Sequence, residues 1–238
     1  MKILAIDSSS LTASVAIVED NMTIAEYTVN YKKTHSQTLL PMLDEIVKMT
    51  EQDMTTIDAI AVAAGPGSFT GLRIGSATVK GLAQALNKPV VAVPTVDGLA
   101  GNLYGTDKLV CPIMDARRNQ TYTGLYEFVK KDEVYEMNCI VEQCAVDIMD
   151  IIGKINELNR EVIFLGDGVP VFADIIREHV RVPFSFAPNT CNRQRAAVVG
   201  LIGMQLFLQG KAESAVTHAP EYLRLSQAER ELKEKNAT

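Results

Sequence analysis

The residues with the clearest chemical potential lie between Ala63 and Gly75, in the stretch AAGPGSFTGLRIG. The apolar run at residues 57–63 predicts a buried strand, and residues 69–86 predict a long helix. A strand, a tight Gly-Pro-Gly turn and a helix N-terminus present unpaired backbone N–H groups above the end of a sheet. Such groups suit an anion, a carboxylate of a partner protein or simply a tight corner.

This glycine stretch differs from two known catalytic loops. No Gly-Lys-Ser/Thr follows at the spacing of a P-loop, and Ser68 lacks the flanking glycines of a nucleophile elbow. A protease is also not expected, because the chain contains no Cys/His, Ser/His/Asp or HExxH pattern. The stretch alone therefore identifies no reaction.

Two aspartates hold equivalent positions in the chain. Asp7 and Asp115 each follow an apolar run, at residues 2–6 and 109–114, and are predicted at the ends of strands. Three serines follow Asp7, whereas Arg117 and Arg118 follow Asp115. These guanidiniums could pair bidentately with a phosphate, with a partner's carboxylate or with the other half of the protein.

The composition is typical of a globular protein. Of the 238 residues, 47% are hydrophobic and 22% are charged, and no apolar run approaches the roughly 20 residues that span a bilayer. Asp7 interrupts the N-terminal apolar run before a signal peptide could form. The formal net charge of −6 argues against direct nucleic-acid binding, which requires a basic face. The four cysteines form no CxxC pair, which predicts reduced thiols.

The elements that must position these residues occur twice in the same order. In the first half, strands at residues 2–6, 13–18 and 23–31 precede a helix at 36–49, a strand at 57–63, the helix at 69–86, a strand at 89–93 and a short helix at 95–103. In the second half, strands at 109–114, 120–127 and 133–141 precede a helix at 145–158, a strand at 161–165, a helix to residue 179 and a final helix at 195–208. We expect two lobes, residues 1–104 and 105–220, and a tail at 221–238 that is charge-rich from residue 227 and forms a frayed helix or is disordered.

Two such halves, each with an aspartate after its first strand, resemble the actin-like (ASKHA) fold, a duplicated ribonuclease H-like α/β architecture in which helices flank mixed sheets. The alternative is an unrelated α/β domain in which both aspartates merely terminate strands. Actin-like ATPases usually place glycine directly after the first aspartate, so that the backbone can approach phosphate. The three serines after Asp7 therefore predict no independent ATPase activity.

Five ordered segments resemble one bacterial family, TsaB, also called YeaZ. They are IDSSS at residues 6–10, THS at 34–36 followed by LLP at 39–41, the glycine stretch, MDARR at 114–118, and PEYLR at 220–224. The resemblance covers nearly the whole chain. It implies a role in making N6-threonylcarbamoyladenosine (t6A) at adenosine-37 of tRNA.

The family resemblance also implies partners. We expect a non-catalytic, cytoplasmic scaffold that docks the catalytic paralogue TsaD and the small ATPase TsaE, reaches tRNA only through that complex, and forms a homodimer when TsaD is absent. We expect no cofactor and no membrane association. TsaD binds a metal ion through two histidines one helical turn apart, but here the residue four positions after His35 is Leu39, so no metal site is expected. The alternative function is a stand-alone actin-like ATPase or small-molecule kinase.

The resemblance places the docking surface on the first-lobe helices at residues 36–49 and 69–86. The second helix contains Gly71, Gly75 and Gly81, and an interior glycine costs about 1 kcal/mol relative to alanine. This cost indicates that something approaches the helix backbone closely, either the protein's own sheet and neighbouring helix or a partner. The predicted docking residues are Leu39, Met42, Leu43, Ile46, Gly71, Leu72, Gly75, Thr78 and Val79.

A groove between the lobes is the second expected site, for TsaE or for a nucleotide. Gly166 and Gly168 resemble the adenosine-side glycines of actin-like enzymes, although two glycines in a strand–helix turn need no ligand. The predicted groove residues are Asp7, Ser9, Gly67, Ser68, Thr70, Asp115, Arg117, Arg118, Gly166 and Gly168.

Overall fold

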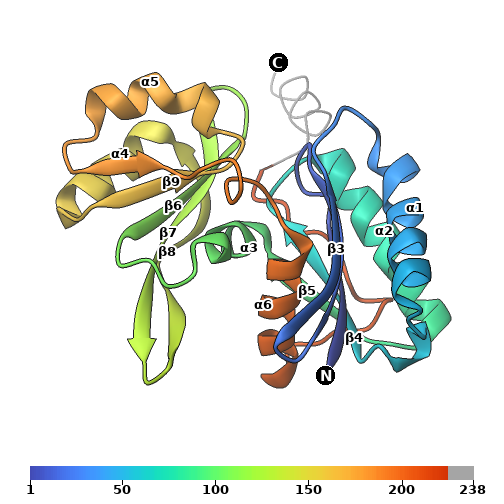
Figure 1. Cartoon of the computed structure of the whole chain (residues 1–238). Coiled ribbons are helices and arrows are strands. Elements are labelled where there is room, and N and C mark those ends of the chain that lie inside the picture. Colours follow the sequence, from blue (N-terminus) through green and yellow to red (C-terminus); the bar gives the residue numbers. More distant parts are fainter. Residues whose placement is uncertain (225–238) are drawn as a thin grey trace, which may run out of the picture.

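The computed structural model describes residues 1–224, so most of the predicted tail, residues 225–238, lies outside the described residues. The first lobe is built on a five-stranded sheet of order β3-β2-β1-β4-β5 (Figure 1). Its strands are β1 (Lys2–Asp7), β2 (Ala13–Glu19), β3 (Met22–Val29), β4 (Ala59–Gly65) and β5 (Val90–Pro94). The first three strands pair antiparallel, and β4 pairs in parallel with both β1 and β5. Its connecting helices are α1 (His35–Thr50), the 3-10 turn η1 (Met54–Thr56) and α2 (Phe69–Leu86).

The second lobe repeats this topology with a sheet of order β10-β9-β6-β7-β8. Its strands are β6 (Leu109–Asp115), β7 (Gln120–Lys131), β8 (Val134–Asp147), β9 (Val162–Leu165) and β10 (Phe184–Phe186), and its helices are α4 (Ile148–Leu158) and α5 (Val169–His179). β6 takes the central place that β1 has in the first sheet, so Asp7 and Asp115 end the two central strands. The duplication confirms the predicted two-lobed, actin-like α/β fold.

The remaining helices cross between the halves of the chain. Helix α3 (Thr95–Ala100), continued by the 3-10 turn η2 (Gly101–Leu103), lies between the sheets: it contacts β4 and β5 of the first and β6 and β7 of the second, where Leu99 is in one cluster with Tyr126. Helix α6 (Ala196–Leu208) packs on β1, β2, β4 and β5 of the first sheet. The predicted division into residues 1–104 and 105–220 stays a prediction, but α6 packs on the lobe opposite to its place in the sequence, and α3 lies at the boundary between the lobes. Apolar periodicity shows that a helix must cover a sheet, but it does not show which sheet.

Two predicted boundaries in the second lobe are also corrected. Residues 145–147 continue strand β8, where Val146 pairs with Thr121, and are not the start of a helix. Helix α4 starts at Ile148 because the Asp147 carboxylate accepts a hydrogen bond from the N–H of Met149 at 2.9 Å. Strand β10 was not predicted; it is only three residues long and pairs in parallel with β9 at the sheet edge.

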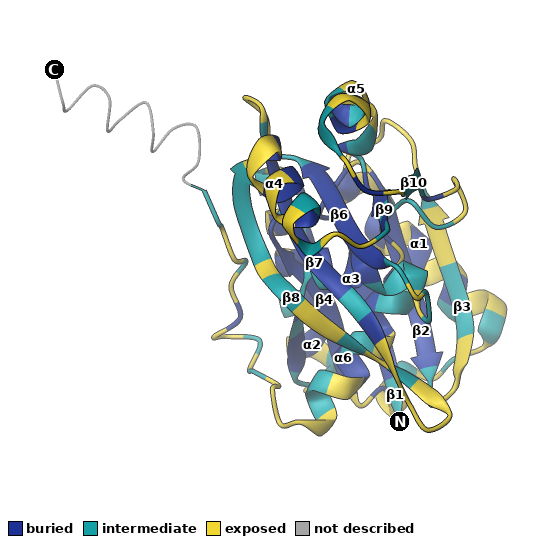
Figure 2. Cartoon of the chain, turned by 90° about the vertical axis from the view of Figure 1, so that its left-hand side faces the viewer, coloured by how far each residue is buried: buried dark blue, intermediate teal, exposed yellow. Residues whose placement is uncertain are grey.

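Strands β1, β2 and β4 of the first sheet are buried on both faces, whereas the edge strand β3 is largely exposed (Figure 2). Leu4 and Ile6 face the cluster beneath α1 and α2, whereas Ile3 and Ala5 face α6. A strand that is buried on both sides reads as a continuous apolar run, as β1 and β4 do. Within residues 1–224, no helix combines the length and apolar character that crossing a membrane requires.

Residues 209–224, here called the strap, return from α6 along the first lobe. Glu213 forms a bridge with Val90, and the N–H of Glu221 donates to the carbonyl oxygen of Ala64 at 2.7 Å. The Tyr222 ring stacks on Phe69 with 4.7 Å between the ring centroids. The strap therefore packs on the end of β4 and the start of α2.

Candidate functional site

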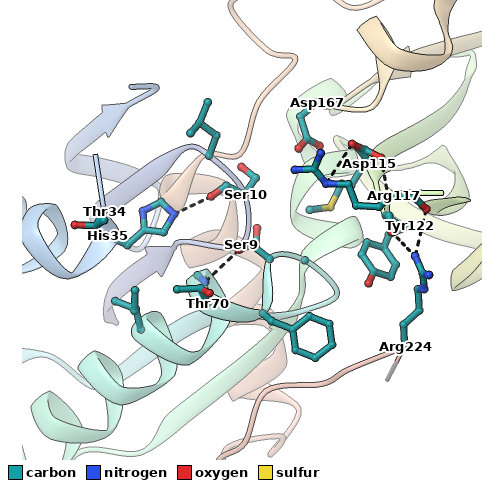
Figure 3. A pocket seen from close by; sticks show the side chains of 18 of the residues that line it. Ser9, Ser10, Thr34, His35, Thr70, Asp115, Arg117, Tyr122, Asp167 and Arg224 are labelled. Carbon is teal, nitrogen blue, oxygen red and sulfur yellow. Dashed lines mark hydrogen bonds and ion pairs between the residues drawn. The ribbon is translucent and has the colours of Figure 1, made fainter. Parts of the chain in front are cut away.

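A groove of roughly 640 Å³ lies between the two lobes (Figure 3). Residues from the turn after β1, the start of α1 and α2, strands β6 and β7 of the second sheet, and the strap line it. The predicted groove residues that line it are Ser9, Gly67, Ser68, Thr70, Asp115, Arg117 and Arg118. These seven residues lie on both sides of the groove, although Ser9 and Asp115 are more than a hundred positions apart in the sequence.

Asp7 does not line the groove. Its side chain is 1% exposed, and its Oδ1 accepts hydrogen bonds from the backbone N–H of Ser9 at 2.9 Å and the Ser9 hydroxyl at 2.7 Å. Burial raises the pKa of this carboxyl, and the two bonds from Ser9 lower it in part. Asp7 thus holds the turn between β1 and β2, which corrects its predicted place in the groove.

The glycines of the stretch 63–75 make room for the protein's own backbone. A Cβ on Gly67 would overlap the carbonyl oxygen of Ser9, and a Cβ on Gly65 would overlap that of Glu221 in the strap. The amides are also used: Gly65 N–H donates to the Thr95 hydroxyl at 3.1 Å, and Ser68 N–H donates to the Ser9 carbonyl at 2.7 Å. The stretch is therefore a tight corner, which leaves few amides for a phosphate.

The first turn of α2 keeps three hydrogen-bond donors that have no acceptor within residues 1–224. The Ser68 hydroxyl caps the helix by accepting from the N–H of Gly71 at 3.3 Å. Within residues 1–224, the amides of Phe69 and Thr70 donate to no protein atom, and the Thr70 hydroxyl makes no hydrogen bond. Both residues line the groove.

The corresponding glycines of the second lobe also serve close packing. A Cβ on Gly166 or Gly168 would press against the carbonyl group of Ile113 in β6, and the N–H of Gly168 donates to that carbonyl at 2.9 Å. Neither glycine lines the groove. Their predicted contact with a ligand is corrected, since β6 already occupies the space that the missing side chains leave.

The turn after Asp115 has an unusual backbone. Arg117, Arg118 and Asn119 all have positive φ, at 66°, 57° and 59°, a conformation that residues other than glycine adopt infrequently. Two side chains hold this turn: Asp115 accepts from the N–H of Arg117 at 2.8 Å, and Arg224 of the strap donates to the carbonyl oxygen of Ala116 (Figure 3). The turn is thus fixed by groups from its own strand and from the strap.

The charges of the groove are uneven. Arg117 forms a loose ion pair with Asp115, with Nε 3.7 Å from Oδ2, and its side chain is 87% exposed. Arg118 and Lys33 have no ion-pair partner within residues 1–224. Asp167 also faces the groove; its Oδ1 is buried without a hydrogen-bond partner, and burial raises the pKa of this carboxyl. Among the described residues, no cluster of three or more His, Cys, Asp or Glu side chains could hold a metal ion.

His35 is a structural residue in this groove. It is the first residue of α1, its side chain is 9% exposed, and its Nε2 lies 2.8 Å from the carbonyl oxygen of Ser10. Leu39, one turn later, is 1% exposed and belongs to the first-lobe core. The ring therefore ties α1 to the turn after β1.

The predicted docking residues on α1 and α2 lie inside the first lobe. A Cβ on Gly71 would overlap the carbonyl oxygen of Ser8, and one on Gly75 would overlap the Ser8 hydroxyl, so both glycines admit the protein's own turn. Of the nine predicted residues, only Thr78 is not buried; the buried ones are Leu39, Met42, Leu43, Ile46, Gly71, Leu72, Gly75 and Val79. The periodicity of these eight residues follows the buried core, and the exposed positions of α1 carry other apolar residues, such as Leu40 at 52% and Met49 at 76% exposure.

Sequence reasoning missed Lys33, Leu11, Phe69 and Arg224 as groove residues. The segment PEYLR at residues 220–224 resembles a family motif, but nothing in its composition indicates that its arginine reaches the other lobe. Lys33 lies in a polar loop with no periodicity, where only the tertiary structure shows what it faces.

The comparisons with known proteins agree with one another. A family model described as TsaD, tRNA N6-adenosine threonylcarbamoyltransferase, matches residues 23–232. The chain is 34% identical over 231 residues to the tRNA threonylcarbamoyladenosine biosynthesis protein TsaB of Bacillus subtilis (strain 168), with 96% of each chain covered. It is 30% identical to the protein of the same name from Escherichia coli (strain K12), with 94% of this chain and 95% of that one covered.

Solved structures give the same result. A crystal structure of an uncharacterized protein with similarity to peptidase YEAZ from Pseudomonas aeruginosa has a TM-score of 0.77 and 25% identity, with 94% of this chain and 99% of that one covered. A second structure, YeaZ from Pseudomonas aeruginosa, has a TM-score of 0.76 and 25% identity, with 93% and 100% covered.

Proposed function

Since the chain belongs to the TsaB (YeaZ) family, we propose that it is an accessory subunit of the machinery that makes t6A at adenosine-37 of tRNA. The relatives' names and the family match support the pathway. The close packing of backbone carbonyls against glycines of both lobes supports a non-catalytic role and is the observation on which the proposal rests. Gly67, Gly71 and Gly168 each accommodate a carbonyl oxygen of the protein itself, so the groove offers little open backbone for a phosphate.

The docking surface for a TsaD homologue is the outward side of α1 and α2 in this proposal. The two helices lie side by side on the outer face of the first sheet (Figure 1). Their exposed apolar residues include Leu40 and Met49 on α1, and the adaptable side chain of methionine suits a surface that meets more than one partner. The same surface would form a homodimer when TsaD is absent. A TsaE homologue would contact the interlobe groove, and tRNA would be reached only through the cytoplasmic complex.

The docking proposal is tested with Leu40→Glu and Met49→Glu. A charge on an apolar interface should weaken co-purification with TsaD by about tenfold or more and should lower t6A formation in a reconstituted reaction, measured by mass spectrometry of digested tRNA. Leu208→Glu is the matched control, because Leu208 is an equally exposed apolar residue at the end of α6. Equal co-purification of all variants with TsaD would contradict the docking surface, and full tRNA modification without this chain would contradict the function.

The alternative is a stand-alone ATPase or small-molecule kinase. Only the location of the groove between two actin-like lobes favours it. Mg²⁺-dependent ATP turnover by the purified chain, with ATP affinity measured by calorimetry, would establish that alternative and remove the non-catalytic role.

A further inference from the structure

We propose that the interlobe groove binds a peptide segment of a partner protein that carries both acidic and apolar side chains. In this proposal Lys33, Arg117 and Arg118 pair with carboxylates of the segment. The inference rests on the proposed function in one respect, namely that the chain works by binding other proteins. It adds the chemistry of the segment that the groove recognises.

The first observation is the charge of the groove. Its lining contains four cationic side chains, Lys33, Arg117, Arg118 and Arg224, against two carboxylates, Asp115 and Asp167. The whole chain has the opposite balance, with 29 acidic residues and 23 lysines and arginines. A local excess of cations on an acidic protein attracts an acidic ligand to that place and not to the rest of the surface.

Two of these cations are available for a ligand. Lys33 comes from the loop between β3 and α1 of the first lobe, and Arg118 from the β6–β7 turn of the second. Neither has an ion-pair partner within residues 1–224, and both side chains are exposed. A segment that lies along the groove can therefore meet a cation from each lobe.

The N-terminal turn of α2 adds uncharged hydrogen-bond donors. The amides of Phe69 and Thr70 and the Thr70 hydroxyl have no protein acceptor within residues 1–224 and border the groove. α2 has 18 residues, so its N-terminus carries a full helix dipole, which favours a carboxylate at this position. Together with the unpaired cations, these donors suit an acidic side chain.

The groove also has apolar walls. Leu11 at the groove is 51% exposed, and the partly exposed Phe69 and Ile74 contribute further apolar surface. The Tyr222 ring stacks on the Phe69 ring, with 4.7 Å between the ring centroids, and so fixes the position of Phe69. An inorganic anion would leave this apolar surface in water, whereas a segment with leucine-like side chains would cover it.

The arginines are presented on a fixed turn. Arg117 and Arg118 have left-handed backbone conformations, and Asp115 and Arg224 hold the turn by hydrogen bonds. Backbone strain of this kind recurs at ligand-binding positions, where the surrounding structure maintains it. A fixed turn limits the conformational entropy that the arginines lose on binding.

Phosphate-rich ligands fit less well. The glycine turns are filled by carbonyl oxygens of Ser8, Ser9 and Ile113, so the amides at the start of α2 lack the open glycine-rich loop that would enclose a polyphosphate. RNA would also extend its charges beyond the groove over a chain of net charge −6. A short acidic peptide confines its charge to the cationic part.

The experiment measures the fluorescence anisotropy of a labelled peptide of about ten residues in which glutamate and leucine alternate, added to the full chain. The same peptide with glutamine in place of glutamate tests the charge requirement. The groove variants are Arg118→Glu and Lys33→Glu. Their matched controls are Lys130→Glu in the second lobe and Lys211→Glu beside the first, two exposed lysines that no ion pair engages within residues 1–224. Tripolyphosphate and a short single-stranded RNA serve as competitors.

We expect the acidic peptide to bind, the glutamine peptide to bind more weakly, and each groove variant to weaken binding by about tenfold while the controls stay within about twofold. Equal binding by Arg118→Glu and the parent chain would overturn the proposal. So would binding of tripolyphosphate or RNA without binding of the peptide, which would indicate a phosphate site. Co-purification of Arg118→Glu with TsaD separates the two proposals, because it should persist if the helices dock TsaD, whatever the groove binds.

Discussion

Single residues around the groove form two groups, buried anions and exposed cations. Asp7 is almost fully buried, and burial raises its pKa, although two hydrogen bonds from Ser9 oppose this effect. Lys33 and Arg118 are exposed and lack an ion-pair partner within residues 1–224. A carboxylate that is buried against its own turn serves the fold, whereas unpaired surface cations remain available to a ligand.

The raised pKa of Asp7 gives a prediction about stability and pH. Because its pKa is higher in the folded protein than in the unfolded chain, the folded protein gains a proton first as pH falls. Protonation of Asp7 therefore stabilises the folded protein at low pH. This stabilisation is lost as pH rises from the usual aspartate range, about 4, through the raised pKa of Asp7. Asp7→Asn keeps an oxygen acceptor for Ser9 but removes the ionisation, so we expect the variant to gain stability relative to the parent over this window. Urea denaturation at several pH values measures the difference.

Asp53→Asn is the control for this profile. Hydrogen bonds from Thr55 lower the pKa of Asp53, so its contribution is present above the usual aspartate range and is lost as pH falls through the lowered pKa. The difference in the free energy of unfolding between Asp53→Asn and the parent should change with pH in the opposite direction to that of Asp7→Asn, and at a lower pH. A pH-independent difference for Asp7→Asn would contradict the role given to burial.

At the scale of elements, helix α2 shows how one sequence feature can have two causes. Gly71 and Gly75 contact the turn after β1, where a side chain would overlap Ser8. Gly81 lies in the same helix, exposed, with no atom within 4 Å of a Cβ placed on it. The sequence shows three glycines in a helical pattern, and only their neighbours tell that two of them are required for packing.

This contrast predicts opposite effects of one substitution. Gly71→Ala should lower the free energy of unfolding by about 1–3 kcal/mol, because the carbonyl of Ser8 belongs to the backbone and cannot easily move. Gly81→Ala should raise it by up to about 1 kcal/mol through helix propensity alone. Chemical denaturation of both variants makes the comparison. If Gly71→Ala were as stable as Gly81→Ala, the close contact between α2 and the β1–β2 turn would be wrong.

At the scale of the whole molecule, the two lobes exchange their covering helices. α3 from the first half of the chain lies between the sheets and joins the core of the second, and α6 from the second half covers the first. Tyr126 of β7 also donates to the carboxylate of Asp97 in α3 at 2.6 Å. The lobes are therefore joined by their own cores and not only by a linker.

The exchange predicts that the first lobe depends on the end of the chain. A chain that stops at Gln194 lacks α6 and the strap, so Ile3, Ala5 and Val18 would face water. We expect fast hydrogen exchange across β1, β2 and β4 in this truncated chain and retained protection in β6 and β9, measured by mass spectrometry against the full chain. Protection of β1 equal to that in the full chain would show that α6 is dispensable for the lobe.

The sequence by itself determined much of this protein. The helix at Phe69–Leu86 was predicted with its observed bounds, because its apolar residues keep a helical period. The duplicated order of strands, the place of Asp7 and Asp115 at strand ends, and the family also followed from local patterns. These features depend on residues that are close together in the chain.

Only the tertiary structure decided which segments pack against each predicted helix, strand and glycine turn. It determined that α3 and α6 cross between lobes, that the glycine corners enclose carbonyl oxygens of the protein, and that eight predicted docking residues fill the core. It also brought Arg224 of the strap to the turn after Asp115. The physical reason is that periodicity and composition identify a surface that must be covered or a backbone that must be approached closely, whereas the identity of the covering group depends on contacts between distant segments.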